Sequence, residues 1–156
     1  MCNNTLLGQR LNLTSSIDIF DNLIKKNEWE TLIRLFSLNI LDINHRDCKG
    51  RNILYFAILN KKYEYIKILF DLRVNSRVNF SLNAINFAVC LDDIKSLEIL
   101  LKCGLSVDTL DEIGTSPLIY AILYNKKKST EFLIKSGADL ELEDFMGNCA
   151  KKMLQN

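Results

Sequence analysis

Residues 111–143 read DEIGTSPLIYAILYNKKKSTEFLIKSGADLELE, and Asp144 then begins the same pattern again with DFMGNCAKKML. The step from Asp111 to Asp144 gives a period of 33 residues. Periods of about 20 to 50 residues indicate stacked units, because one unit of this size cannot bury its own apolar face. The repetition therefore predicts a stack of similar units.

Two further copies precede this stretch. Residues 78–110 place Ala88 and Gly104 where the later copy has Ala121 and Gly137. Residues 47–77 form a shorter copy that opens with D-x-x-G, as the stretches at 111 and 144 do. The same positions therefore carry the same kinds of residue through three inner copies.

Weaker copies lie toward both ends of the chain. Residues 17–46 contain two helical apolar patterns and a DIN tail without a clear D-x-x-G opening, so we interpret them as a degenerate first repeat. Residues 144–156 are cut short and place lysines where inner copies have apolar residues, as a solvated cap requires. We predict one domain, 1–156, made of an N-terminal segment 1–16 and the repeats 17–46, 47–77, 78–110, 111–143 and 144–156.

Local signals within each copy predict a helix, a turn, a second helix and an extended loop. In the copy at 111–143, Ser116 and Pro117 suit the cap and the first position of a helix. Leu118 and Ala121 then share one helical face. A second apolar pattern ends at Gly137, where a left-handed cap needs no Cβ.

The stretches GTSPLIYA and FLIKSGADLELED resemble the ankyrin-repeat family, whose signature is T-P-L-H-x-A. The resemblance covers roughly residues 17–154. It implies an all-α solenoid of four to five stacked helix-turn-helix units with β-hairpin-like loops. It also implies that the chain works by binding another protein.

Some signature positions depart from the family pattern. The copy at 78–110 has Ser81 and Ala84 where the family has glycine and proline. The family's histidine helps to tie the turn together, and Tyr55, Asn86 and Ile119 stand in its place. The resemblance therefore implies the ankyrin fold with a less rigid turn.

Composition narrows the class of protein further. Twenty basic residues balance nineteen acidic ones, and a formal charge of +1 does not favour a nucleic acid or an acidic membrane surface as partner. Five scattered cysteines without a CxxC pair favour a reducing, cytoplasmic environment. We find no signal peptide and no apolar run of membrane-spanning length.

The sequence offers no pattern for catalysis, a metal or a cofactor. His45 has no nucleophile pattern beside it, so we predict no catalytic residue and no enzyme activity. Cys90, Cys103 and Cys149 do not follow zinc spacing and are interpreted as buried or half-buried thiols. Gly50 and its equivalents recur at the repeat period, which indicates turns and not a phosphate loop.

Lysine pairs in the turns between helices suggest a basic ridge at first sight. They occur at 25–26, 61–62 and 126–128. Asp92 and Asp93 occupy the same turn of the copy at 78–110 and interrupt the ridge. We interpret these turns as solvated and not as a nucleic-acid track.

An unusual feature lies at the ends of the first helices and in the neighbouring loop tips. The family usually places variable, solvent-facing residues there, whereas this chain has many apolar ones, which suit an apolar groove with a charged edge. Packing between neighbouring repeats is the alternative interpretation. The predicted partner-binding residues are Lys49, Arg51, Leu59, Asn60, Phe80, Leu82, Cys90, Leu91, Glu112, Ile113, Leu123, Tyr124, Phe145 and Met146.

We therefore predict a non-enzymatic binding module, monomeric or weakly dimeric, that occupies the surface of another protein as an inhibitor, an immunity or antitoxin-like protein, or an adaptor. One alternative is a bacterial or viral ankyrin protein that targets a host protein. Another is a self-associating structural protein in which a symmetric dimer buries Leu59, Leu91, Leu123 and Tyr124.

Overall fold

A computed structural model describes residues 13–155, and within that range it contains nine helices and no strand. The backbone divides into two compact units, with the boundary between Asp42 and Ile43. Each unit is described by itself below. The single domain 1–156 stays a prediction, whereas the all-α class expected from the sequence is confirmed.

The first unit contains two helices, α1 (Leu13–Lys25) and α2 (Trp29–Ser37). Asn27 in the turn between them has a left-handed backbone with φ of 60°. Its side-chain oxygen accepts a hydrogen bond of 2.9 Å from the Trp29 indole. Phe20, Trp29 and Leu32 are buried side chains of this unit.

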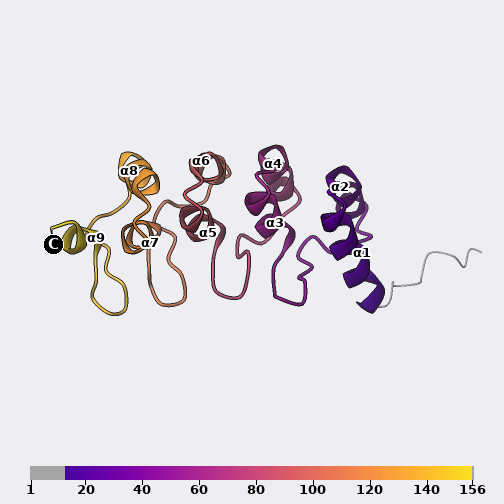
Figure 1. Cartoon of the computed structure of the whole chain (residues 1–156), viewed down its shortest axis with the longest axis horizontal. Coiled ribbons are helices and arrows are strands. Elements are labelled where there is room, and N and C mark those ends of the chain that lie inside the picture. Colours follow the sequence, from indigo (N-terminus) through magenta and orange to yellow (C-terminus); the bar gives the residue numbers. More distant parts are fainter. Residues whose placement is uncertain (1–12, 156) are drawn as a thin grey trace, which may run out of the picture. The chain divides into compact units, whose positions relative to one another are not determined.

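The second unit stacks three helix pairs and one final helix (Figure 1). The helices are α3 (Ile53–Leu59), α4 (Tyr63–Asp71), α5 (Ala84–Cys90), α6 (Ile94–Lys102), α7 (Pro117–Leu123), α8 (Lys127–Lys135) and α9 (Ala150–Leu154). Each of the predicted repeats 47–77, 78–110 and 111–143 contains one pair, and 144–156 contains α9. The loops from α4 to α5, α6 to α7 and α8 to α9 extend to one side of the stack (Figure 1).

The first helix of each pair is short because a side-chain cap and a turn define its ends. Asn52, Asn83 and Ser116 each accept a hydrogen bond from the backbone N–H three residues later. Such caps satisfy an N–H group that has no partner within the helix. The predicted cap at Ser116 and the predicted first-position Pro117 are both confirmed.

The second helices end in left-handed residues. Gly104 and Gly137 have φ of 92° and 86°, which confirms the cap predicted at Gly137. Arg73 occupies the equivalent place after α4 with φ of 67°. A residue with a Cβ is disfavoured in this conformation, so the copy at 47–77 departs from glycine where glycine fits best.

The core of the second unit follows the repeat period. Ala57, Ala88 and Ala121 occupy one position of the first helices, and all three are fully buried. A small side chain at this position allows neighbouring helices to approach closely. The large, fully buried side chains around them are Ile53, Leu54, Ile58, Ile66, Leu69, Ile85, Leu97, Leu100, Leu118 and Ile119. Burial of each such side chain contributes about 1.5–3 kcal/mol.

Hairpin character in the long loops is slight. Among residues 13–155 it consists of two isolated antiparallel bridges, Arg77 with Asn83 and Glu143 with Cys149. Side chains hold the loops together with backbone hydrogen bonds, since Asp47, Asp111 and Asp144 each accept hydrogen bonds from two following backbone N–H groups. These carboxylates explain why D-x-x-G recurs in the sequence.

The turn at Asp92 and Asp93 is more than a solvated turn. The Asp92 carboxylate accepts hydrogen bonds of 2.9 and 2.6 Å from the backbone N–H and hydroxyl of buried Ser129, in the next repeat. The Asp93 carboxylate accepts a hydrogen bond of 3.1 Å from the Tyr63 hydroxyl, in the preceding repeat. These bonds tie the second helices of adjacent repeats, which charge pattern alone did not indicate.

Candidate interaction surface

Six of the predicted residues form what we call the helix-end row: Leu59, Asn60, Cys90, Leu91, Leu123 and Tyr124. They lie at the ends of α3, α5 and α7, after the helix positions that face the core. Leu123 and Tyr124 are 60% and 56% exposed, whereas Cys90 is half-buried. Exposed apolar side chains therefore recur at one place in each repeat.

Aromatic side chains support the helix-end row. The rings of Tyr55 on α3 and Phe87 on α5 stack with their centroids 4.4 Å apart. The Arg51 guanidinium lies 5.3 Å from the Tyr55 ring centroid. The rings of Tyr120 and Tyr124 stack at 5.8 Å. Tyr124 of the row thus stacks on an aromatic ring, and the Tyr55–Phe87 stack links two neighbouring repeats. We call these rings the aromatic layer.

Tyr120 is also fixed by a hydrogen bond. Its hydroxyl donates to the Asp111 carboxylate at 2.7 Å. Burial and this bond to a carboxylate raise the pKa of Tyr120 well above its ordinary value. The aromatic layer was missed in the sequence, although Phe56, Phe87 and Tyr120 occupy one repeat position and could have revealed it.

A second group occupies the long loops. Lys49, Phe80, Ile113 and Met146 have equivalent positions in successive loops, and all are exposed. We call these four the loop-tip row. Phe145 lies beside Met146, and the two side chains are 79% and 84% exposed.

Glycines in the preceding loops hold two of the exposed rings. The Phe80 ring lies so close to Gly50 that a methyl group at Gly50 would overlap it. A methyl group at Gly114 would lie 2.7 Å from the Phe145 ring. Both glycines have φ of 73°, so the backbone conformation and the ring packing favour glycine together. The rings are exposed and still positioned by a neighbouring loop.

Eleven of the fourteen predicted residues are exposed, and Arg51, Leu82 and Cys90 are half-buried. Arg51 is engaged within its own loop, where its guanidinium forms an ion pair of 2.5 Å with Asp47. The seven-residue first helices rise about 10 Å between the loops and the helix-end row. The predicted residues thus form two groups, and their role in binding stays a prediction.

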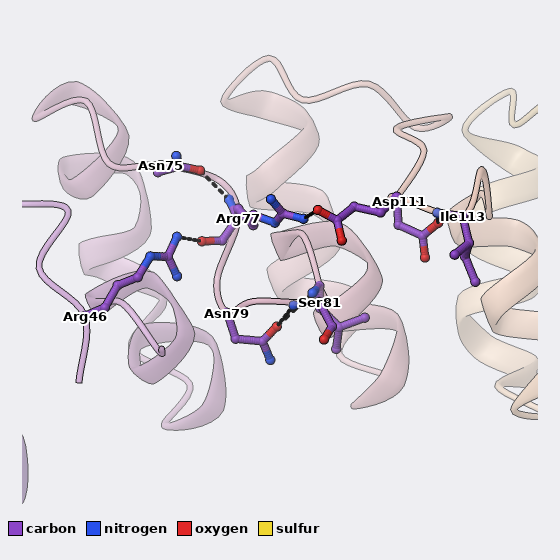
Figure 2. A network of polar contacts seen from close by, with 9 residues as sticks. Arg46, Asn75, Arg77, Asn79, Ser81, Asp111 and Ile113 are labelled. Carbon is purple, nitrogen blue, oxygen red and sulfur yellow. Dashed lines mark hydrogen bonds and ion pairs between the residues drawn. The ribbon is translucent and has the colours of Figure 1, made fainter. Parts of the chain in front are cut away.

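Arginines connect the long loops (Figure 2). The Arg46 guanidinium donates to the carbonyl oxygens of Gly50 and Arg77 at 2.6 and 2.7 Å. The Arg77 guanidinium pairs with the Glu112 carboxylate of the next loop. Burial and the nearby charge of Arg77 lower the pKa of Arg46. Arg46 and Arg77 were not predicted, because the partners they contact are mainly backbone carbonyls that sequence does not place.

Charge along the loops is divided into two halves. The loops at 43–52 and 72–83 carry five basic residues and one acidic residue, Asp47, which is paired with Arg51. The loops at 103–116 and 136–149 carry no lysine or arginine. Their acidic residues are Asp108, Asp111, Glu112, Asp139, Glu141, Glu143 and Asp144. Glu112, Glu141 and Glu143 are paired with Arg77, Lys151 and Lys152, so the excess acidic charge of these loops rests on their four aspartates. A near-neutral chain therefore has a basic and an acidic half on its loop side.

The opposite side of the second unit has a groove of about 870 Å³ between α4 and α6. Tyr63, Phe70 and Ile99 line it together with Lys67 and Lys102. The Cys103 thiol at its edge is half-buried, and burial and the charge of Asp71 raise its pKa. A thiol that is held protonated in this way is a poor nucleophile.

Residues 13–155 contain no group of three or more His, Cys, Asp or Glu side chains that could hold a metal ion. None of their helices combines the length and the apolar character needed to cross a bilayer.

Comparison with known proteins identifies the repeats. A family model described as "Ankyrin repeats (3 copies)" matches residues 71–144. Residues 71–144 are ankyrin repeats. This match and the stacked helix pairs confirm the predicted all-α ankyrin solenoid, and ankyrin repeats are protein–protein interaction modules and not a catalytic family.

A relative extends the similarity beyond the matched repeats. The chain is 28% identical over 145 residues to the Potassium channel AKT2/3 of Arabidopsis thaliana. The aligned region covers 88% of this chain and 18% of the channel. The chain therefore spans less than a fifth of the length of this relative.

Proposed function

We propose that this ankyrin stack binds another protein through the helix-end row and acts by occupying that protein's surface. The exposure of Leu91, Leu123 and Tyr124 at successive repeats carries the proposal. Contiguous apolar area on a folded protein favours an interaction site, and a tyrosine adds a hydroxyl that can hydrogen-bond at its edge. Stacking on Tyr120 limits the conformational freedom that the Tyr124 side chain loses on binding.

Surface occupation suits an inhibitor, an immunity or antitoxin-like protein, or an adaptor, because each needs a binding face and no chemistry. A cytoplasmic location belongs to the same proposal. Cys48 is exposed, and Cys48, Cys90, Cys103 and Cys149 are free thiols among the described residues. Free thiols persist in a reducing compartment.

The test compares partner capture by the wild-type chain with capture by Leu91→Arg/Tyr124→Asp. A tagged chain is used as bait in extracts of its source cells, and stoichiometric partners are identified by mass spectrometry. We expect the double variant to lose at least about tenfold in captured partner, since buried charge without a counterion opposes association. Circular dichroism should show unchanged helix content.

Ile68→Arg is the matched control, because Ile68 on α4 is 39% exposed and Leu91 is 41% exposed. The control should capture the partner as the wild type does. The proposal fails if the double variant still captures it, or if the double variant unfolds and thereby shows that the two side chains belong to the core.

A further inference from the structure

We propose that the loop tips pair two copies of this chain in an antiparallel arrangement, on a surface separate from the helix-end row. The loop-tip row reads Lys49, Phe80, Ile113 and Met146 along the stack. It therefore begins with a cation and continues with three exposed apolar side chains. The last of these lies next to Phe145 in an acidic loop.

The order of basic and acidic loops along the stack favours a second copy of this chain as the partner, and it also favours an antiparallel direction. A two-fold axis between the loops of Phe80 and Ile113 places the basic half of one chain against the acidic half of the other. A partner that matches this surface must carry acidic charge opposite the basic loops and basic charge opposite the acidic loops. An antiparallel copy of this chain already has its charges in that order. A parallel pairing would oppose like charges, which is unfavourable. The same axis brings Phe80 of each chain near Ile113 of its partner, so apolar side chains meet at the centre.

Contacts within one chain already position the loop tips before two copies pair. The Phe80 ring rests on Gly50 and the Phe145 ring on Gly114. Ion pairing of Arg77 with Glu112 joins two of the loops. Since the rings and loops are positioned beforehand, pairing costs less conformational entropy than it would for free loops.

Sedimentation equilibrium and light scattering of the full chain test the pairing. We expect the average mass to rise from monomer toward dimer with concentration at low salt. Salt should weaken the dimer, because charges on exposed loops are screened over about 10 Å at 0.1 M ionic strength. A chain that stays monomeric up to millimolar concentration overturns the proposal.

Two charge-reversed variants test the arrangement. Lys49→Glu/Arg77→Glu lowers the formal charge of the basic half from +4 (five basic residues and one acidic) to zero, and Glu141→Lys/Glu143→Lys lowers that of the acidic half from −7 (seven acidic residues) to −3. Each variant alone should dimerise at least about tenfold more weakly than wild type. An equimolar mixture should favour a 1:1 heterodimer over either homodimer, because the unchanged acidic half of the first variant then faces the unchanged basic half of the second.

The matched control is Lys127→Glu/Lys128→Glu, which changes formal charge as much as the first variant does but lies on α8. It should dimerise like wild type. Failure of the mixture to associate, or equal weakening in the control, overturns the loop-tip arrangement. Loss of the dimer in Leu91→Arg/Tyr124→Asp would also overturn it and place self-association on the helix-end row. Partner capture is measured separately, so the two proposals can fail independently.

Discussion

At the scale of single residues, two fully buried asparagines have opposite surroundings. The Asn52 side chain accepts a hydrogen bond from the backbone N–H of Tyr55 and donates to the carbonyl oxygens of Asn75 and Arg77. Neither side-chain oxygen nor nitrogen of Asn86 has a hydrogen-bond partner among the described residues. A buried amide without partners costs free energy because it has lost its hydration.

Replacement of Asn86 by isoleucine should therefore stabilise the fold. Ile119 occupies the equivalent position of the next repeat and is fully buried, so an apolar side chain fits this environment. We expect Asn86→Ile to raise the free energy of unfolding by about 1–2 kcal/mol. Urea unfolding followed by circular dichroism measures the change.

Asn52→Leu is the paired control, since it removes an asparagine of equal burial whose bonds are satisfied. It should lower the free energy of unfolding by about 1–3 kcal/mol, through loss of a helix cap and two buried bonds to backbone carbonyls. Equal effects of the two substitutions would show that hydrogen bonding does not distinguish these sites.

Single residues were predicted correctly from the sequence where a backbone conformation strongly prefers one residue type. Ser116 and Gly137 were placed correctly because a side-chain cap and a left-handed end have strong preferences. Lys61 and Arg73 adopt the same left-handed conformation without being glycine. Their conformation follows from the packing of the helices that flank them, which no local preference reveals.

At the scale of an element, the opening loop of each repeat is organised by one acceptor side chain. Asp47, Asp111 and Asp144 hold their loops in the same way. In the copy at 78–110, Val78 stands at the aspartate position, and Asn79 instead accepts from the N–H groups of Ser81 and Leu82. The acceptor has moved by one residue, so the loop is retained without D-x-x-G.

Asp47 makes the stability of its loop dependent on pH. Burial alone would raise the pKa of this carboxyl, but hydrogen bonds from the Arg51 side chain and from the N–H groups of Arg51 and Lys49 lower it overall. Because the pKa is lower in the folded state, the carboxylate stabilises the fold fully above the unfolded value of about 4 and less as pH falls below it.

Asp47→Asn should cost about 1–3 kcal/mol at pH 7, since the amide can still accept the two backbone bonds, as Asn79 does, but loses the charge-assisted bond to Arg51. The gap between wild type and variant should stay constant from pH 7 to pH 5 and narrow below about pH 4. Denaturant unfolding at each pH measures it. If the free energies of unfolding of wild type and variant differ by the same amount down to pH 2, the pKa of Asp47 is the same in the folded and unfolded states.

The order of elements was predictable, and the side-chain arrangement was predictable only in part. Apolar periodicity and recurring Ala57, Ala88 and Ala121 place each helix pair, because every pair must bury the same face. Eleven of the fourteen candidate residues are indeed exposed. Phe80 over Gly50 and Arg46 across two loops could not be foreseen, since such contacts depend on how adjacent repeats are offset.

At the scale of the whole molecule, charge is distributed unevenly along the chain. The loops of the second unit change from basic to acidic, although the chain carries a formal charge of only +1. Links between repeats, such as Asp92 with Ser129 and Tyr63 with Asp93, lie within that unit. In a repeat stack, stability is the sum of such nearest-neighbour terms, so the best-linked repeats should define the cooperative core.

Residues 43–156 should therefore fold without the preceding part of the chain. Their boundary follows the division of the backbone at Asp42 and Ile43, and the bonds of Asn52 and Arg46 described above all lie within the segment. We expect the segment to keep its helical circular dichroism and to unfold in a single cooperative urea transition. The dependence of its free energy of unfolding on urea concentration should be smaller than that of the full chain, roughly in proportion to its smaller buried surface. The comparison is with the full chain under the same conditions. A segment that melts gradually, while the full chain unfolds in one step, would contradict this expectation and support one domain spanning 1–156, because cooperativity would then depend on both units.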